Sequence, residues 1–177
     1  MPDKPYPENL AETFTLHSGR PVLLRPIRPE DEPEHHALLA KLTPEDIHSR
    51  FFGTFHKMPH SVMERFTNID YDREMAFIAS ADTADGGYET LGVVRTINID
   101  EGDSAEFAIV IRSDIKHQGL GGKLMEKIIS YSRDKGVKRL EGMILAENHP
   151  MLDLVRRLGF RVRLIPGEGV METTLDL

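Results

Sequence analysis

The chain has 177 residues, with 22 Lys and Arg against 29 Asp and Glu, so its formal net charge is −7, and it contains no cysteine. This length predicts a single domain, and the 40% hydrophobic share supplies enough apolar side chains for one core, which excludes a wholly disordered chain. The lack of cysteine excludes disulfides, thiol nucleophiles and cysteine-based metal sites, and the acidic balance argues against a domain that binds nucleic-acid backbones.

The start of the chain carries no sign of export or membrane insertion. No apolar run approaches the roughly 20 residues of a spanning helix, and the first ten residues lack the layout of a signal peptide. We therefore expect a cytoplasmic protein without a membrane partner. Three prolines among polar neighbours predict an extended lead-in or linker over residues 1–13, followed by one domain over 14–177.

The first half of the chain combines one strand with helical segments. Prolines flank an apolar run at 21–26, which is typical of a short strand. Acidic residues and a proline then open a helix that continues to Leu42. Capping signals predict a second helix over 43–52 and a short third one over 61–66.

From residue 74 the apolar period changes to that of strands. Strands are predicted over 75–79 and 90–97, on either side of an Asp-Gly-Gly turn, and over 105–112. Residues 119–135 have the apolar stripe of an amphipathic helix. The remaining elements are a strand at 139–145, a helix at 151–158 and strands at 160–164 and 170–175. This order predicts a mixed α/β domain.

The glycine-rich segment 116–123 is the most informative part of the sequence. It lies between a strand and an amphipathic helix, where backbone N–H groups at a helix start can hold anionic oxygens. Leu124 stands where a P-loop needs a serine or threonine and where a dinucleotide-binding motif needs its last glycine. We therefore exclude these two classes of nucleotide-binding protein. A tight strand-to-helix turn without a ligand is the alternative. Nearby basic residues outnumber acidic ones by four to two, namely Arg112, Lys116, Lys123 and Lys127 against Asp114 and Glu126.

Two motifs in this half resemble the GNAT acetyltransferase superfamily. The pattern K-x-x-G-x-G at 116–121 is similar to its acetyl-CoA loop, with lysine in place of the usual arginine or glutamine. The N-x(10)-G-F pattern from Asn148 to Phe160 resembles a second signature of the superfamily. The amino-acid sequence of residues 23–31 and 105–160 resembles that of the acetyltransferase domain of bacterial Pat-type protein lysine acetyltransferases.

The resemblance implies a mixed, mostly antiparallel central sheet with one parallel, splayed strand pair and flanking helices. It implies acetyl transfer from acetyl-CoA to a primary amine, with a protein lysine, for example of an acyl-CoA synthetase, as the favoured acceptor. It also implies that the chain can be part of a larger multidomain protein. A small-molecule amine N-acetyltransferase and a non-catalytic acyl-CoA sensor are the alternatives. The acetyl-CoA contacts implied are Ile109, Val110, Ile111, Lys116, His117, Gln118, Gly119, Leu120, Gly121, Gly122, Lys123 and Asn148.

Glu106 is the candidate general base. It interrupts an otherwise apolar strand, and the period of two places it on one face with Ala108 and Val110. Desolvation in such a strand would raise the pKa of the carboxyl and suit a base, and the resemblance implies the same role. A solvated edge-strand carboxylate is the alternative.

Five further expectations complete the prediction. Asn148 matches a cofactor contact of the superfamily but can equally cap a helix. Val155 stands where many members carry a tyrosine general acid, so water or the displaced ammonium proton would serve instead. No metal site is predicted, because Pro59 separates His56 from His60. Phe51, Phe52 and Phe55 are expected in the core rather than at an acceptor mouth, and Tyr131 is also expected to pack in the core.

Overall fold

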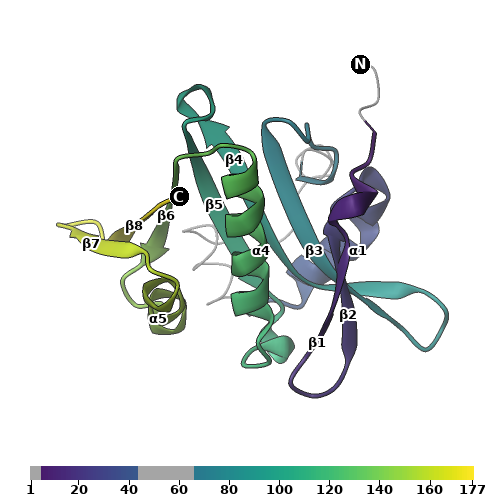
Figure 1. Cartoon of the computed structure of the whole chain (residues 1–177). Helices are drawn as coiled ribbons and strands as arrows, with labels where there is room; N and C mark the ends of the chain where they lie inside the picture. Colours follow the sequence, from purple (N-terminus) through teal and green to yellow (C-terminus); the bar gives the residue numbers. More distant parts are fainter. Residues whose placement is uncertain (1–4, 44–65) are drawn as a thin grey trace.

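The computed structural model describes residues 5–43 and 66–177. Within these ranges eight strands form one sheet in the order β1-β2-β3-β4-β5-β6-β8-β7 (Figure 1). The strands are β1 (Glu12–Thr15), β2 (Pro21–Pro26), β3 (Glu74–Asp82), β4 (Tyr88–Ile99), β5 (Ser104–Ile111), β6 (Arg139–Leu145), β7 (Arg161–Ile165) and β8 (Val170–Asp176). The helices are α1 (Glu32–Ala40), α4 (Leu120–Asp134) and α5 (His149–Arg157), with 3-10 turns at Glu8–Leu10, Pro29–Asp31, Asp100–Gly102 and Ser113–Ile115.

All strand pairs are antiparallel except β5 and β6, which run parallel. The predicted mixed sheet with one parallel pair is therefore confirmed. The helices expected over 43–52 and 61–66 lie outside the described residues, apart from positions 43 and 66. His56, His60 and the phenylalanines at 51, 52 and 55 also lie outside the described residues.

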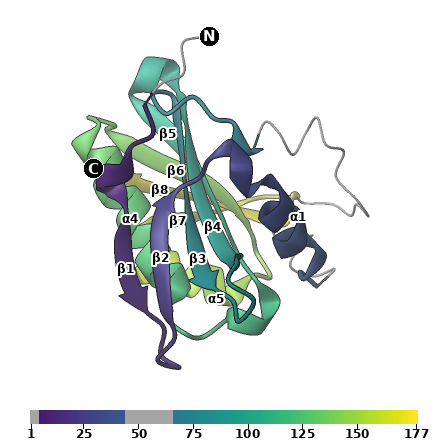
Figure 2. The same ribbon diagram turned by 90° about the vertical axis from the view of Figure 1, so that its right-hand side faces the viewer.

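The sheet separates two layers of helix. Helix α4 covers one face and α1 the other (Figure 2). Leu120, Leu124 and Ile128 form the buried stripe of α4 that the periodicity predicts. Each stripe residue is removed almost completely from solvent, and burial of this size is the main favourable term in folding.

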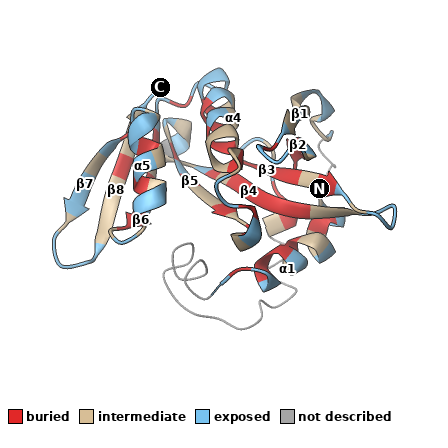
Figure 3. Cartoon of the chain, turned by 90° about the horizontal axis from the view of Figure 1, so that it is seen from below, coloured by how far each residue is buried: buried red, intermediate tan, exposed pale blue. Residues whose placement is uncertain are grey.

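The core is concentrated where α4 and α1 sandwich the central strands (Figure 3). On the α4 side, Met75 and Phe77 of β3 pack in the same cluster as the helix stripe. On the α1 side, Ile78 of β3 joins Leu38 of the helix. Alternate residues of one strand thus serve both layers, as the pleat requires.

The N-terminus differs from the predicted lead-in. Glu12 and Thr13 already belong to β1 and pair with Leu24 and Leu23 of β2. A four-residue strand with alternating half-buried and exposed side chains has little apolar signal of its own, so pairing with β2 defines it. None of the described helices carries an apolar stretch long enough to cross a bilayer.

Candidate functional site

Strands β5 and β6 are paired over only three residues before they part. The parallel register ends at Glu106 opposite Glu141. Beyond it β5 continues along β4 as far as Ile111, while β6 continues along β8 as far as Leu145. The facing edges of the two strands are therefore unpaired over the second half of each strand.

An aromatic ring lies at the point where the strands part. Phe107 follows the last paired residue of β5, and its ring packs edge to face on Phe160 with 5.3 Å between centroids. A Cβ atom at Gly142 of β6 would lie 2.7 Å from this ring, so only glycine leaves room for it. The separation of β5 from β6 is thus filled from the α4 side by a packed aromatic pair.

A cleft of about 1160 Å³ opens from this fork. Its walls are the facing edges of β5 and β6, the loop leading into α4, and helix α5 along its length. Among the predicted site residues, Gln118 and Lys123 do not line it. Those that line it are Glu106, Ile109, Val110, Ile111, Lys116, His117, Gly119, Leu120, Gly121, Gly122 and Asn148.

The glycine-rich loop presents unpaired N–H groups to the cleft. Gly119 is the N-cap of α4 and has a φ of 85°, a left-handed conformation that favours glycine. The first helical amide to reach a carbonyl is that of Lys123, which donates to the Gly119 oxygen at 3.2 Å. The amides of the three residues between them point out of the helix start, where the helix dipole also favours an anion.

The sequence predicts a locally basic loop, but three of the four basic residues counted there pair with carboxylates of the fold. Arg112 is buried and donates to Glu89 at 2.9 Å and to Asp114 at 2.5 Å. These hydrogen bonds hold the pKa of both carboxyls below the usual range. Lys123 and Lys127 turn toward Glu12 of β1, at 3.4 and 3.0 Å. These three cations are therefore paired within the fold.

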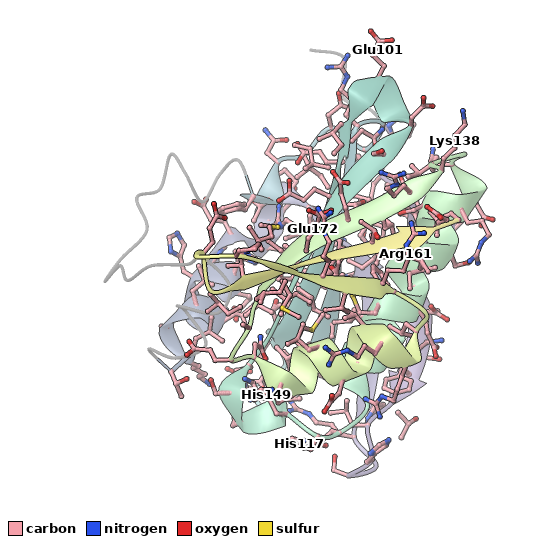
Figure 4. All side chains as sticks on the ribbon, turned by 90° about the vertical axis from the view of Figure 1, so that its left-hand side faces the viewer. Glu101, His117, Lys138, His149, Arg161 and Glu172 are labelled. Carbon is pink, nitrogen blue, oxygen red and sulfur yellow. The ribbon has the colours of Figure 1, made fainter. Side chains whose placement is uncertain are left out.

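Other basic side chains line the cleft in their place. Arg156 and Arg157 at the end of α5 belong to the lining, as do His149 at its start and His17 from the turn between β1 and β2. Figure 4 shows His149 and His117 at the same end of the molecule. Sequence reasoning missed these four lining residues. Arg156 and Arg157 gave no distinct signal, because basic residues in a last turn equally match ordinary helix-end electrostatics.

Glu106 lies on the predicted face of β5 but is exposed. The expectation of a desolvated carboxylate is wrong, because α4 and α5 cover the opposite face, where Ala105 and Phe107 are buried. On the Glu106 side, α1 packs over β4 and the Val110 end of β5. Glu106 nevertheless lines the cleft at its inner end, beside the fork.

Asn148 has the capping role that the sequence left open, and its cofactor contact stays a prediction. Its Oδ1 accepts a hydrogen bond from the Met151 N–H at 3.4 Å and so caps α5, and the residue also lines the cleft. Val155 is fully buried in the core. Tyr131 packs on Phe77 at 5.7 Å, in agreement with its predicted core role, and no tyrosine in the described part of the chain lines the cleft.

A family model for an acetyltransferase (GNAT) domain matches residues 22–161, which is most of the chain. The chain belongs to the GNAT acetyltransferase family. An acetyltransferase of Pseudomonas aeruginosa is 32% identical over 146 residues, covering 82% of this chain and 78% of that protein. The GNAT resemblance inferred from the two motifs is thereby confirmed.

Solved acetyltransferase structures share the fold over most of the chain. The GNAT domain of S. lividans PAT superposes with a TM-score of 0.87 at 24% identity, covering 98% of this chain and 100% of that one. Spermidine N-acetyltransferase from Vibrio cholerae, in complex with CoA and spermine, gives a TM-score of 0.68 at 20% identity, covering 88% and 95%. The chain thus has the GNAT fold, and the part that the structure describes contains an eight-stranded sheet in which β5 and β6 run parallel.

Proposed function

We propose that this GNAT domain transfers an acetyl group from acetyl-CoA to the side chain of a protein lysine, with Glu106 as general base. The observation that carries the proposal is one continuous cleft. It runs from unpaired amides at the start of α4, along the free edge of β5, to a carboxylate at the fork.

The residues of the cleft fit acetyl-CoA. The amides of Leu120, Gly121 and Gly122 suit the diphosphate. The half-buried Ile109 and Ile111 supply an apolar wall, and the unpaired main-chain groups of β5 facing β6 suit the amide-bearing pantetheine arm. Cleft-lining arginines at the end of α5 add positive charge for the phosphates.

Acetyl-CoA supplies a thioester carbonyl, at which the amine forms a C–N bond as the C–S bond breaks. A lysine amine has a pKa of about 10.4 in water, so it must lose a proton before it attacks. Glu106 takes this proton, directly or through a water, since its carboxylate is exposed at the inner end of the cleft. Val155 offers no proton for the departing thiolate, which takes one from water or the proton released by the ammonium group.

The choice of a protein acceptor rests on the likeness of residues 23–31 and 105–160 to Pat-type acetyltransferases. The S. lividans PAT domain matches this chain over its entire length. Acyl-CoA synthetases are the expected targets of that class, and modification of their active-site lysine is the expected outcome.

The test is a transfer assay with the purified chain and labelled acetyl-CoA, using mass spectrometry to locate the product. One reaction contains an acyl-CoA synthetase, a second its active-site Lys→Arg variant as the matched control, and a third a panel of polyamines, amino acids and aminoglycosides. We expect acetylation of the intact synthetase at the lysine that the control lacks.

Turnover with free amines alone would refute the protein acceptor and indicate a small-molecule N-acetyltransferase. Tight binding of acetyl-CoA without transfer to any amine would instead indicate an acyl-CoA sensor.

A further inference from the structure

The turn between β1 and β2 contacts the glycine-rich loop, although the contacting residues His17 and Gln118 are 101 positions apart in sequence. The His17 N–H donates to the Gln118 carbonyl at 3.1 Å. Leu16, the preceding residue, is buried in the main core and anchors the turn. The backbone at His17 is therefore held in place against the loop.

The imidazole of His17 lies directly over Gly119. A Cβ atom built on Gly119 would be 2.7 Å from Nε2 and 3.2 Å from both Cδ2 and Cε1. The Nε2 corner of the ring thus points at the N-cap of α4. The missing side chain and the φ of 85° are two separate reasons for glycine at this position.

The imidazole is available to a ligand. His17 is exposed and lines the cleft together with Gly119, Leu120 and Gly121. Within the described residues its ring nitrogens have no hydrogen-bond partner. Nε2 carries a proton in one neutral tautomer and in the charged form, so it can donate in both.

The same hairpin withdraws two cations from the helix start. Glu12 of β1 pairs with Lys123 and Lys127 of α4, and its pKa is lowered because these two lysines outweigh the effect of burial. The donors left at the start of α4 are the backbone amides and the side chains that line the cleft, with His17 nearest to the N-cap.

We propose that His17 is part of the diphosphate-binding site and donates a hydrogen bond from Nε2 to the phosphate oxygens held by the α4 amides. This inference rests on the proposed use of acetyl-CoA. It makes the β1–β2 hairpin a further wall of the acetyl-CoA site, in addition to β5, the loop before α4 and α5.

The test compares two ligands by isothermal titration calorimetry. CoA carries the diphosphate, and pantetheine has the same thiol arm without any phosphate. We expect His17→Ala to weaken CoA binding about tenfold, the lower range for a hydrogen bond to a charged group. Pantetheine affinity should not change. His17→Gln keeps an N–H donor and should lose less, and Ser18→Ala, on the exposed neighbour in the same turn, is the matched control.

Three outcomes would overturn the inference. Unchanged CoA affinity in His17→Ala would show that the imidazole does not contact the ligand. An equal loss for CoA and pantetheine, with a lowered melting temperature, would show that His17 only supports the loop. Failure of the wild-type chain to bind CoA at all would refute the proposed function itself, and with it the role of His17.

Discussion

Glu106 is exposed to solvent and lines the cleft, and it is not buried. It stands beside Glu141 in the last registered pair of β5 and β6, and its carboxylate is exposed. Removal from water therefore does not activate this group as a base. In the proposed function its contribution comes from its position at the inner end of the cleft, where it can take the proton of an incoming amine directly or through a water.

Glu106→Gln keeps the shape of the side chain and removes its capacity to accept a proton. We expect kcat to fall by about 10²-fold or more, as is usual for loss of a general base, with little change in acetyl-CoA affinity, because the residue is remote from the α4 amides. Steady-state kinetics and calorimetry measure the two quantities. Glu126→Gln, on the exposed face of α4, is the matched control. Full activity of Glu106→Gln would exclude this residue as the base.

The start of α4 is the element on which the proposed binding of acetyl-CoA depends. Its first turn contains two glycines, so the backbone amides are not covered by side chains. A Cβ on Gly121 would make ordinary contacts, at 3.6 Å to Leu154 and 4.0 Å to Ile111. The helix can thus accept a side chain at this position without a clash, and the side chain would project toward the cleft.

Gly121→Glu places a carboxylate where the proposed site holds phosphate. We expect CoA affinity to fall by at least 100-fold through charge repulsion and steric exclusion, while the melting temperature stays within a few degrees, because the backbone there needs no positive φ. Calorimetry and thermal unfolding monitored by circular dichroism check both statements. Ser130→Glu adds the same charge to an exposed position of α4 and should bind normally. Normal CoA binding by Gly121→Glu would contradict the location of the diphosphate.

At the scale of the whole molecule, one buried ion pair connects the sheet to the α1 layer. The Arg25 guanidinium of β2 donates to both carboxylate oxygens of Asp31 at 2.7 and 2.8 Å. Tyr88 of β4 and the Arg28 N–H also donate to this carboxylate. Burial alone would raise the pKa of Asp31, but these hydrogen bonds outweigh it, so the pKa lies below its usual value.

Asp31→Asn leaves Arg25 buried without its counter-charge. We expect the free energy of unfolding at pH 7 to fall by about 3 kcal/mol. Because the folded-state pKa of Asp31 is lowered, its stabilisation is complete above the unfolded value of about 3.9 and is lost as the pH falls through the folded value. Urea denaturation at pH 7 and at pH 3 should therefore show a smaller difference between variant and wild type at the lower pH. Equal stability of the two proteins at pH 7 would show that the pair is not stabilising.

Much of the fold could be predicted from local patterns. The period of α4, the prolines around β2 and the apolar run of β6 lead to elements whose bounds the structure reproduces within one or two residues. Motif spacing led to the GNAT family, which the family model confirms. These features depend on residues close together in sequence, where side-chain periodicity and backbone preference act directly.

The properties of the candidate site depend on contacts between distant residues. The exposure of Glu106 depends on where β5 leaves β6, the pairing of Lys123 and Lys127 on a strand more than 100 residues earlier, and the position of His17 on a hairpin packed against the loop. The number of charged residues along the chain could not show this exposure, these ion pairs or the position of His17. Ion pairs and the register between strands form only when the sheet assembles, so tertiary structure alone decided which of the predicted cations face the cleft.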